Sequence, residues 1–380
     1  MSSPTPMPND SLAMPQKLWR SGTLGNFAGS RDNNFNLVRV IAAMLVLYSH
    51  SFALATGRKE TEPLAAALGT TPGGIAVDIF FITSGFLVTA SLLSRSCARD
   101  FIRARVLRIY PALTVATFLT VCTVGAVLTE LSTVRYLLHP ETLLHLARNI
   151  TLVTGISHTL PGVFVGNPYP NAVNSSLWSL PYEIGMYTGL LTLWLSVGIE
   201  QRRQRLIIAL IAIAAVALAA HFFAHGFWRP SSLLRLTWMF AAGALIQLYR
   251  DRIIVTPARL AIALACILLA SAERTVFLGV YTLLMPFVTL ALAYVPGGAV
   301  RHYNRLGDYS YGIYIYAFPI QQTLALVIPS ISIVEMIVWS GLLTTATAVF
   351  SWHLVEKRAL ALRDRLPRPS KLRAVNVSAD

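Results

Sequence analysis

Arg39 and His50 stand eleven residues apart in the first long apolar stretch of the chain. Eleven helical steps of about 100° bring a side chain almost back to its starting direction and span roughly 16 Å. Both side chains are therefore predicted on one face of a helix. The imidazole of His50 could act as a general base on an alcohol, since its ordinary pKa lies near neutral pH. The guanidinium group of Arg39 could stabilise an anion, so the pair indicates an acid–base site three turns from an anion site.

Five arginines occur between residues 95 and 108. Arg105 and Arg108 are three residues apart and would project from one side of a helix, with Arg103 beside them. Planar guanidinium groups suit phosphate recognition. The segment is predicted to be a loop that leads through Pro111 into an apolar helix. An ordinary basic loop that fixes membrane topology is the alternative for these arginines.

Two carboxylates, Asp78 and Glu183, lie in or near apolar stretches. A buried carboxylate needs a partner, so Glu183 is expected to pair with an arginine or a histidine and to take part in the chemistry. Ser84 is favoured as a hydrogen-bonding residue, because the sequence around it lacks the nucleophile-elbow pattern. Trp178 belongs to the same motif as Glu183, although an interfacial aromatic anchor is the alternative for it.

Tyrosines form the last group of candidate pocket residues. Tyr182 precedes Glu183, and Tyr311 belongs to a tyrosine-rich run that could form a cavity wall or an interfacial belt. His221 and His225 share a helix face, but two ligands without a third make a poor metal site. No metal is therefore expected.

The composition indicates where these residues must lie. Hydrophobic residues make up 55% of the 380 residues, and charged residues make up 13%. Soluble chains carry about 25% charged residues. The deficit, together with repeated apolar stretches near 20 residues, predicts an all-α polytopic membrane protein. The net charge of +14 does not point to nucleic acid, because the basic residues lie in short loops between apolar stretches, where they meet anionic lipids.

Ten transmembrane helices are predicted. Their approximate bounds are 36–56, 74–94, 109–129, 177–199, 206–224, 233–249, 254–271, 276–294, 309–328 and 331–355. This layout places 23 of the 31 Lys and Arg on one side, which predicts that both termini are cytoplasmic.

The chain is accordingly divided into three parts. Residues 1–33 are expected to be a disordered cytoplasmic N-terminus, residues 34–356 the membrane domain, and residues 357–380 a basic cytoplasmic tail. The longest extramembrane stretch, about 130–176, contains an amphipathic piece that is expected to lie in the membrane interface.

The order of these motifs resembles the acyltransferase 3 family of integral-membrane acyltransferases over about residues 33–356. The matching segments are Arg39-x10-His50, VDIFFITSGFL, Arg105-x-x-Arg108-Ile-Tyr-Pro, SLWSLPYE and LGDYSYGIYIYAFP. This chain departs from the family pattern twice. It has Ala317 where many relatives have a histidine, and Ile184 where many have a second carboxylate after Glu183.

The resemblance implies an enzyme of the bacterial inner membrane, of the stand-alone exopolysaccharide type. It implies transfer of an acyl group from acetyl-CoA or a related donor to a hydroxyl of a cell-surface or lipid-linked saccharide. His50 would be the catalytic base, and Arg39, Arg105 and Arg108 would support the donor or the acyl group. A transporter or flippase of a lipid-linked saccharide is the main alternative, with the buried Arg, His and Glu as a relay. A structural subunit of an export complex is a third interpretation.

Overall fold

The structure, a computed structural model, describes residues 19–28, 30, 32–95, 97–196, 202–223 and 232–365. These residues are almost entirely helical, with one two-stranded sheet. His221 and His225 lie outside the residues whose side chains are described. The chain is therefore an all-α protein in which the sheet is a minor element.

Each predicted apolar stretch corresponds to a helix. The helices are α2 (Phe35–Thr56), α4 (Pro72–Arg95), α5 (Ala98–Leu119) with its continuation through a π-helical turn η2 (Thr120–Gly125) into α6 (Ala126–Leu128), α9 (Leu180–Leu195), α10 (Arg202–Phe223), α11 (Ser232–Leu248), α12 (Pro257–Ala270), α13 (Arg274–Tyr294), α14 (Ser310–Val327), and α15 (Ile333–Ser351), which continues through η6 (Trp352–Glu356) into α16 (Lys357–Arg365). Six of these helices, α2, α4, α5–α6, α10, α13 and α15–α16, are long and apolar enough to cross a membrane. The count of ten spans and the orientation of the termini stay predictions.

The arginine-rich segment is helical, and its prediction as a loop was wrong. Helix α5 begins at Ala98 and runs without interruption through Pro111. The proline and the dense charge suggested a break, but alanine and arginine are both strong helix formers. The arginines are therefore held on a rigid helix, not on a mobile loop.

The segments that connect the apolar helices are short, except for the one between α6 and α9. They contain β1 (Gly22–Thr23), α1 (Leu24–Ala28), η1 (Lys59–Thr61), α3 (Ala65–Leu68), α7 (Thr133–Leu137), α8 (Pro140–Thr151), η3 (Ser175–Ser179), β2 (Ile254–Val255) and η5 (Gly298–Arg305). Strand β1 pairs antiparallel with β2, and Trp19 pairs with Pro296. The expected disorder therefore does not extend over residues 19–28. Residues 1–18 and 366–380 lie outside the described residues.

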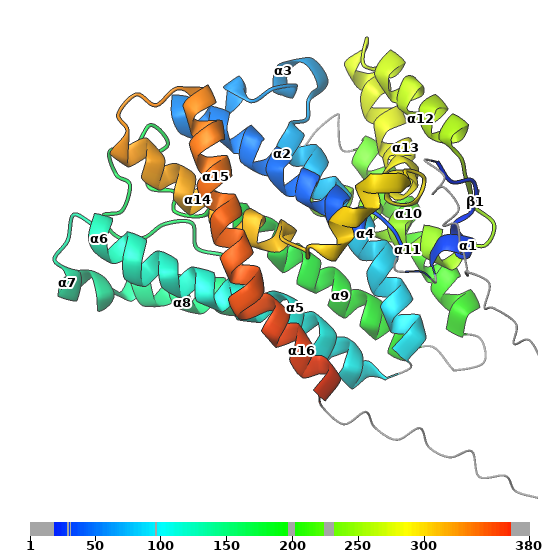
Figure 1. Cartoon of the computed structure of the whole chain (residues 1–380), viewed down its shortest axis with the longest axis horizontal. Coiled ribbons are helices and arrows are strands. Elements are labelled where there is room, and N and C mark those ends of the chain that lie inside the picture. The colour runs from blue at the N-terminus through cyan, green and yellow to red at the C-terminus, as the bar shows by residue number, and fades with distance from the viewer. Residues whose placement is uncertain are drawn as a thin grey trace, which may run out of the picture.

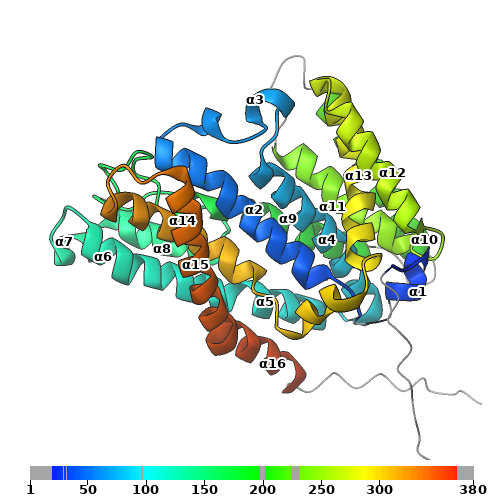
Figure 2. The same ribbon diagram turned by 45° about the horizontal axis from the view of Figure 1, so that its top comes forward.

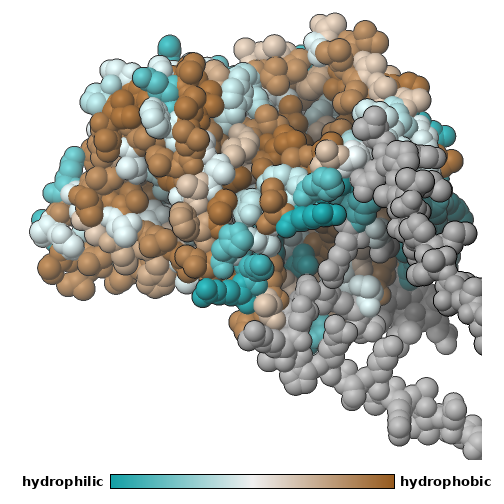
Figure 3. Space-filling model, in the orientation of Figure 1, coloured by the Kyte–Doolittle hydropathy of each residue, from teal (hydrophilic) through white to brown (hydrophobic). Residues whose placement is uncertain are grey.

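Helix α2 lies in the middle of the bundle and positions both residues of the first motif. It packs against α4 and α13 on one side and against α14 and α15 on the other, as Figures 1 and 2 show. The face seen in Figure 3 is largely apolar, and hydrophilic residues gather at its lower edge around α16. An apolar belt with a polar edge is the surface expected of a membrane-embedded bundle.

Helices α4 and α11 cross with their backbones in close approach. A Cβ atom added at Gly85 would lie 2.0 Å from the carbonyl oxygen of Phe240, and one at Gly243 would lie 2.2 Å from that of Ile82. The crossing therefore requires glycine on both helices, as in small-residue packing of membrane helices. It fixes the depth of Ser84, which is the residue before Gly85.

We expect Gly85→Ala to destabilise the protein by about 3 kcal/mol, because the two helices must move apart. Gly189→Ala is the matched control, since no atom lies within 4 Å of a Cβ there and α9 should gain up to about 1 kcal/mol of helix propensity. Thermal unfolding in detergent measures both variants. Equal melting temperatures for the two would contradict the close crossing.

Helix α8 turns its polar face towards the protein. Thr142, His145 and Asn149 are buried, whereas Leu143 and Leu144 are exposed. Asn149 donates to Nε2 of His145 at 2.9 Å, so the proton of this imidazole is on Nδ1, which lies 2.9 Å from the carbonyl oxygen of Thr159. The exposed leucines agree with contact between α8 and lipid, and the buried side chains attach α8 to the loop that follows it.

Acid is expected to loosen this attachment. Burial lowers the pKa of His145 from 6.5 to about 4, so the unfolded segment binds a proton between these values and the folded one does not. The stabilisation is therefore complete above pH 6.5 and is lost as the pH falls towards 4, a change on the order of 3 kcal/mol. Hydrogen exchange of residues 155–160, corrected for its intrinsic pH dependence, measures the effect. The pH dependence should disappear in His145→Gln, and its persistence there would contradict the assignment to His145.

Candidate active site

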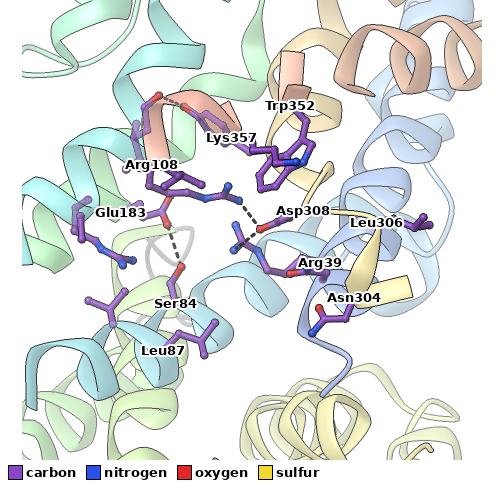
Figure 4. A pocket seen from close by; sticks show the side chains of 18 of the residues that line it. Arg39, Ser84, Leu87, Arg108, Glu183, Asn304, Leu306, Asp308, Trp352 and Lys357 are labelled. Carbon is purple, nitrogen blue, oxygen red and sulfur yellow. Dashed lines mark hydrogen bonds and ion pairs between the residues drawn. The ribbon is translucent and has the colours of Figure 1, made fainter. Parts of the chain in front are cut away.

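A cavity of about 500 Å³ lies at the end of the bundle where α2 and α16 begin (Figure 4). Its walls come from α2, α4, α5, α9, α14, the turn before α14, and α16. The charged residues among its described lining are Arg39, Arg105, Arg108, Glu183, Arg305, Asp308 and Lys357. Cations outnumber anions, so the cavity is suited to a negatively charged ligand.

Asp308 brings two of the predicted arginines together. Its Oδ2 atom lies 3.1 Å from Nη1 of Arg39 and also accepts a hydrogen bond from Arg108. Burial alone would raise the pKa of the Asp308 carboxyl, but Arg108 and Arg39 hold it below its ordinary value. The carboxylate therefore stays charged, and α2 and α5 meet through it.

Glu356 is a second carboxylate beside the same arginine. Its Oε2 lies 3.6 Å from Nη1 of Arg108, and its side chain is 2% exposed. Neither Asp308 nor Glu356 was recognised in the sequence as a site residue. Asp308 stands at the start of the tyrosine-rich motif, and an acidic residue at the mouth of an apolar helix is the signal that could have identified it.

Glu183 lines the cavity, but its partners differ from those predicted. Ser84 donates to its Oε1 at 3.0 Å, and Tyr187, one helical turn later, donates to the same atom. The expected arginine or histidine partner is replaced by these two hydroxyl groups among the described contacts. The guanidinium carbon of Arg105 lies 5.7 Å above the ring of Tyr187, so Arg105 is close to this group without a direct ion pair to it. The hydrogen-bonding role predicted for Ser84 agrees with this geometry.

Tyr311 forms part of the cavity wall. Its hydroxyl donates to the carbonyl oxygen of Ile109 at 3.0 Å, and the guanidinium carbon of Arg108 lies 5.8 Å from its ring centre. The ring therefore supports Arg108 from α14 while its hydroxyl binds the backbone of α5. A cation–π contact of this kind restricts where the guanidinium can point.

Other predicted site residues lie elsewhere. Arg103 is not among the described lining residues, and its ion pair is with Asp100 at 4.0 Å. Arg103 lies two residues before Arg105 and five before Arg108, so at about 100° per residue its side chain points roughly 160° and 140° away from theirs.

Asp78 also lies outside the described lining of the cavity. It is completely buried and binds Arg235 at 3.0 Å and the hydroxyl of Tyr281 at 2.8 Å. It thus connects α4 to α11 and α13, which is a structural contact. Trp178 packs edge-to-face on Tyr182 with ring centres 5.9 Å apart. Tyr182 borders a separate apolar groove between α9, α10 and α11.

His50 is not among the described residues that line the cavity. It lies further along α2, where its Nδ1 atom is 3.5 Å from Oγ of Ser176 and its ring packs edge-to-face on Phe318. Packed rings stand between it and Arg39: Phe80 lies under the guanidinium of Arg39 and contacts Tyr314, which donates to the backbone of Ser176. The predicted shared face therefore does not become one open chamber in this structure.

The geometry can be compared with known proteins. The profile of the family described as "Acyltransferase domain" matches residues 32–356. The chain belongs to this family, and it is an acyltransferase. Family membership confirms the resemblance drawn from the motifs, and it places Arg39, Arg105, Arg108 and Glu183 within the matched region.

Two relatives are similar over nearly their whole length. An O-acetyl transferase of Shigella phage Sf6 is 30% identical over 344 residues, which cover 87% of this chain and 96% of the relative. Nodulation protein 10 of Rhizobium leguminosarum bv. viciae is 30% identical over 376 residues, which cover 91% of this chain and 98% of the relative. No solved structure matches the chain significantly.

Proposed function

We propose that this protein is a multi-pass O-acetyltransferase of the bacterial inner membrane. It transfers an acetyl group from acetyl-CoA to a hydroxyl group of a saccharide, free or lipid-linked, and it has ten spans with both termini in the cytoplasm. The acetyl group is supported by the phage relative, whose name is O-acetyl transferase. The donor and the saccharide are supported by the family resemblance.

One observation supports the assignment of this cavity to the acyl donor. Arg39, Arg105 and Arg108 come from two helices far apart in the sequence and converge on one cavity. The Nε atoms of Arg39 and Arg105 are buried donors without a hydrogen-bond partner among the described residues. Buried donors of this kind normally have a partner, and guanidinium groups bind phosphate oxygens especially well. The phosphates of acetyl-CoA are the acceptors that we assign to the guanidinium nitrogens facing this cavity.

In this proposal His50 is the general base. The acceptor hydroxyl attacks the thioester carbonyl, His50 takes the hydroxyl proton, and CoA leaves as a thiol when that proton returns to its sulfur. The developing oxyanion needs a donor close to His50, so a backbone donor stabilises it, and Arg39 serves the phosphate end of the acyl donor. His50 lies about 16 Å from Arg39 at 1.5 Å per helical residue, so the pantetheine arm has to reach along α2, past Phe80 and Tyr314.

The test uses the purified protein in lipid nanodiscs with acetyl-CoA labelled in its acetyl group. Candidate lipid-linked and free saccharides are added in turn, and label on the saccharide is measured together with released CoA. Labelled saccharide that requires both substrates is the expected result. Movement of the saccharide across a vesicle membrane without consumption of acetyl-CoA would instead establish a flippase and overturn the proposal.

A further inference from the structure

The two oxygens of Asp308 make different contacts. Oδ1 accepts hydrogen bonds from the backbone N–H of Ser310, at 3.3 Å, and from its hydroxyl. Oδ2 faces the cavity and binds Arg39 and Arg108 together. The first N–H group of α14 and the hydroxyl of Ser310 therefore fix the carboxylate, and the fixed carboxylate holds two guanidinium groups that belong to other helices.

The two arginines would otherwise repel each other. They reach the same oxygen from α2 and α5, so two positive groups lie side by side in a largely buried place where Coulomb interactions are strong. Each guanidinium group is also supported by an aromatic ring, with Arg39 over Phe80 at 5.9 Å and Arg108 over Tyr311 at 5.8 Å. Asp308 is the described group that contacts both and offsets their repulsion.

This arrangement leaves donors free for a ligand. A guanidinium group has five N–H donors. Asp308 contacts only one nitrogen of each arginine, Nη1 of Arg39 and Nη2 of Arg108. The side chains of Arg39 and Arg108 remain 21% and 15% exposed and line the cavity. Glu356 stands 3.6 Å from Arg108, longer than a hydrogen bond. The remaining N–H groups can therefore bind phosphate oxygens in the cavity while Asp308 keeps the pair in place.

We propose that Asp308 is a positioning residue, whose carboxylate holds Arg39 and Arg108 side by side as a clamp for the phosphate end of the acyl donor. This inference rests on the proposed function, because it assumes that acetyl-CoA occupies the cavity. Asp308 acts through the two arginines and does not itself contact the donor.

The substitution Asp308→Asn distinguishes a positioning role of Asp308 from an effect of net charge, because the two predict opposite changes in CoA binding. It removes one negative charge and makes the cavity more positive, so net charge alone predicts tighter binding of CoA. Positioning predicts weaker binding, because the amide cannot balance two guanidinium groups and they separate. The asparagine oxygen can still accept from Ser310, so α14 keeps its first turn and the fold should persist.

The experiment measures the dissociation constant of CoA by titration calorimetry on the full chain in nanodiscs. We expect Asp308→Asn to weaken CoA binding about tenfold, as loss of charge-assisted hydrogen bonds implies. Asp308→Glu, which keeps the charge at a shifted position, should fall between Asp308→Asn and the wild type. Asp308→Asn breaks a buried ion pair, so its melting temperature should fall. CoA binding is therefore measured at a temperature where the wild type and both variants are folded, so that weaker binding reports the separation of the two arginines and not unfolding.

Asp100→Asn is the matched control. It makes the same charge change, but next to Arg103, which is outside the described lining of the cavity. It should therefore leave CoA binding unchanged. CoA binding to Asp308→Asn that equals or exceeds that of the wild type would overturn the positioning role and leave the donor site intact. Failure of the wild type to bind CoA would overturn both the positioning role and the proposed donor site.

Discussion

Replacement of His50 by alanine is expected to lower the rate of acyl transfer about 10³-fold, since general acid–base catalysis contributes roughly 10²–10⁴-fold. Binding of CoA should stay within about twofold of the wild type, because His50 lies outside the described lining of the cavity that we assign to the phosphates. Transfer of labelled acetyl to the saccharide and calorimetry with CoA measure the two quantities. The combination of lost turnover and retained binding is the result that a catalytic base predicts.

His302→Ala is the control for this experiment, since His302 is an exposed histidine of η5. It should transfer at the rate of the wild type. Retention of more than a tenth of the wild-type rate by His50→Ala would remove His50 from the mechanism. The reaction would then have to be sought in the cavity itself, where Glu183, bound by Ser84 and Tyr187, is the carboxylate in hydrogen-bonding distance of hydroxyl groups.

The separation of His50 from the cavity is a property of helix α2. One straight helix carries Arg39 near its first turn and His50 near its last, so the two residues share a face and differ in depth. The rings of Phe80 and Tyr314 occupy the space between them. In the mechanism that we propose, a donor bound by its phosphates at one level and reacting at the other has to displace or pass these rings.

The sequence predicted the helices better than it predicted the contacts between them. An apolar stretch of about 20 residues forms a helix in lipid, because only a helix satisfies its backbone hydrogen bonds within the segment. The positions of the helices in the sequence therefore follow from composition. Spacing along one helix also predicted that Arg105 and Arg108 share a side, and both line the cavity. The predicted start of the third helix at residue 109 was wrong, because a helix can extend beyond its apolar part through charged residues and a proline.

Contacts between helices could not be derived in the same way. The pairing of Asp308 with Arg39 and Arg108 depends on the relative heights of α2, α5 and α14 in the bundle. The spacing of residues within one helix does not determine the height of that helix relative to its neighbours. Glu183 was expected to bind a cation, but the residue one turn later on its own helix, Tyr187, binds it. Spacing of four residues was the available signal for this pair.

Arg108→Ala should have a larger effect on donor binding than any other single substitution in the cavity. The change removes the hydrogen bond to Asp308, the ion pair to Glu356 and the contact with Tyr311, all of which one guanidinium group makes. Breaking a buried ion pair costs about 3–5 kcal/mol, much of it from the carboxylates left without a partner. We therefore expect CoA binding to weaken at least about 10²-fold and the melting temperature to fall, both measured on protein in nanodiscs.

Arg103→Ala is the matched control, because Arg103 lies five residues earlier on α5 and pairs with Asp100 at 4.0 Å. A partly exposed pair at this long distance contributes roughly 0–1 kcal/mol, so CoA binding and melting temperature should both stay near the wild-type values. Arg108→Lys keeps the charge but loses the planar fork, and it should bind CoA more weakly than the wild type and more tightly than Arg108→Ala. Equal losses in Arg103→Ala and Arg108→Ala would mean that the net positive charge of α5 attracts the donor, and the convergence of guanidinium groups on the cavity would then have no special role.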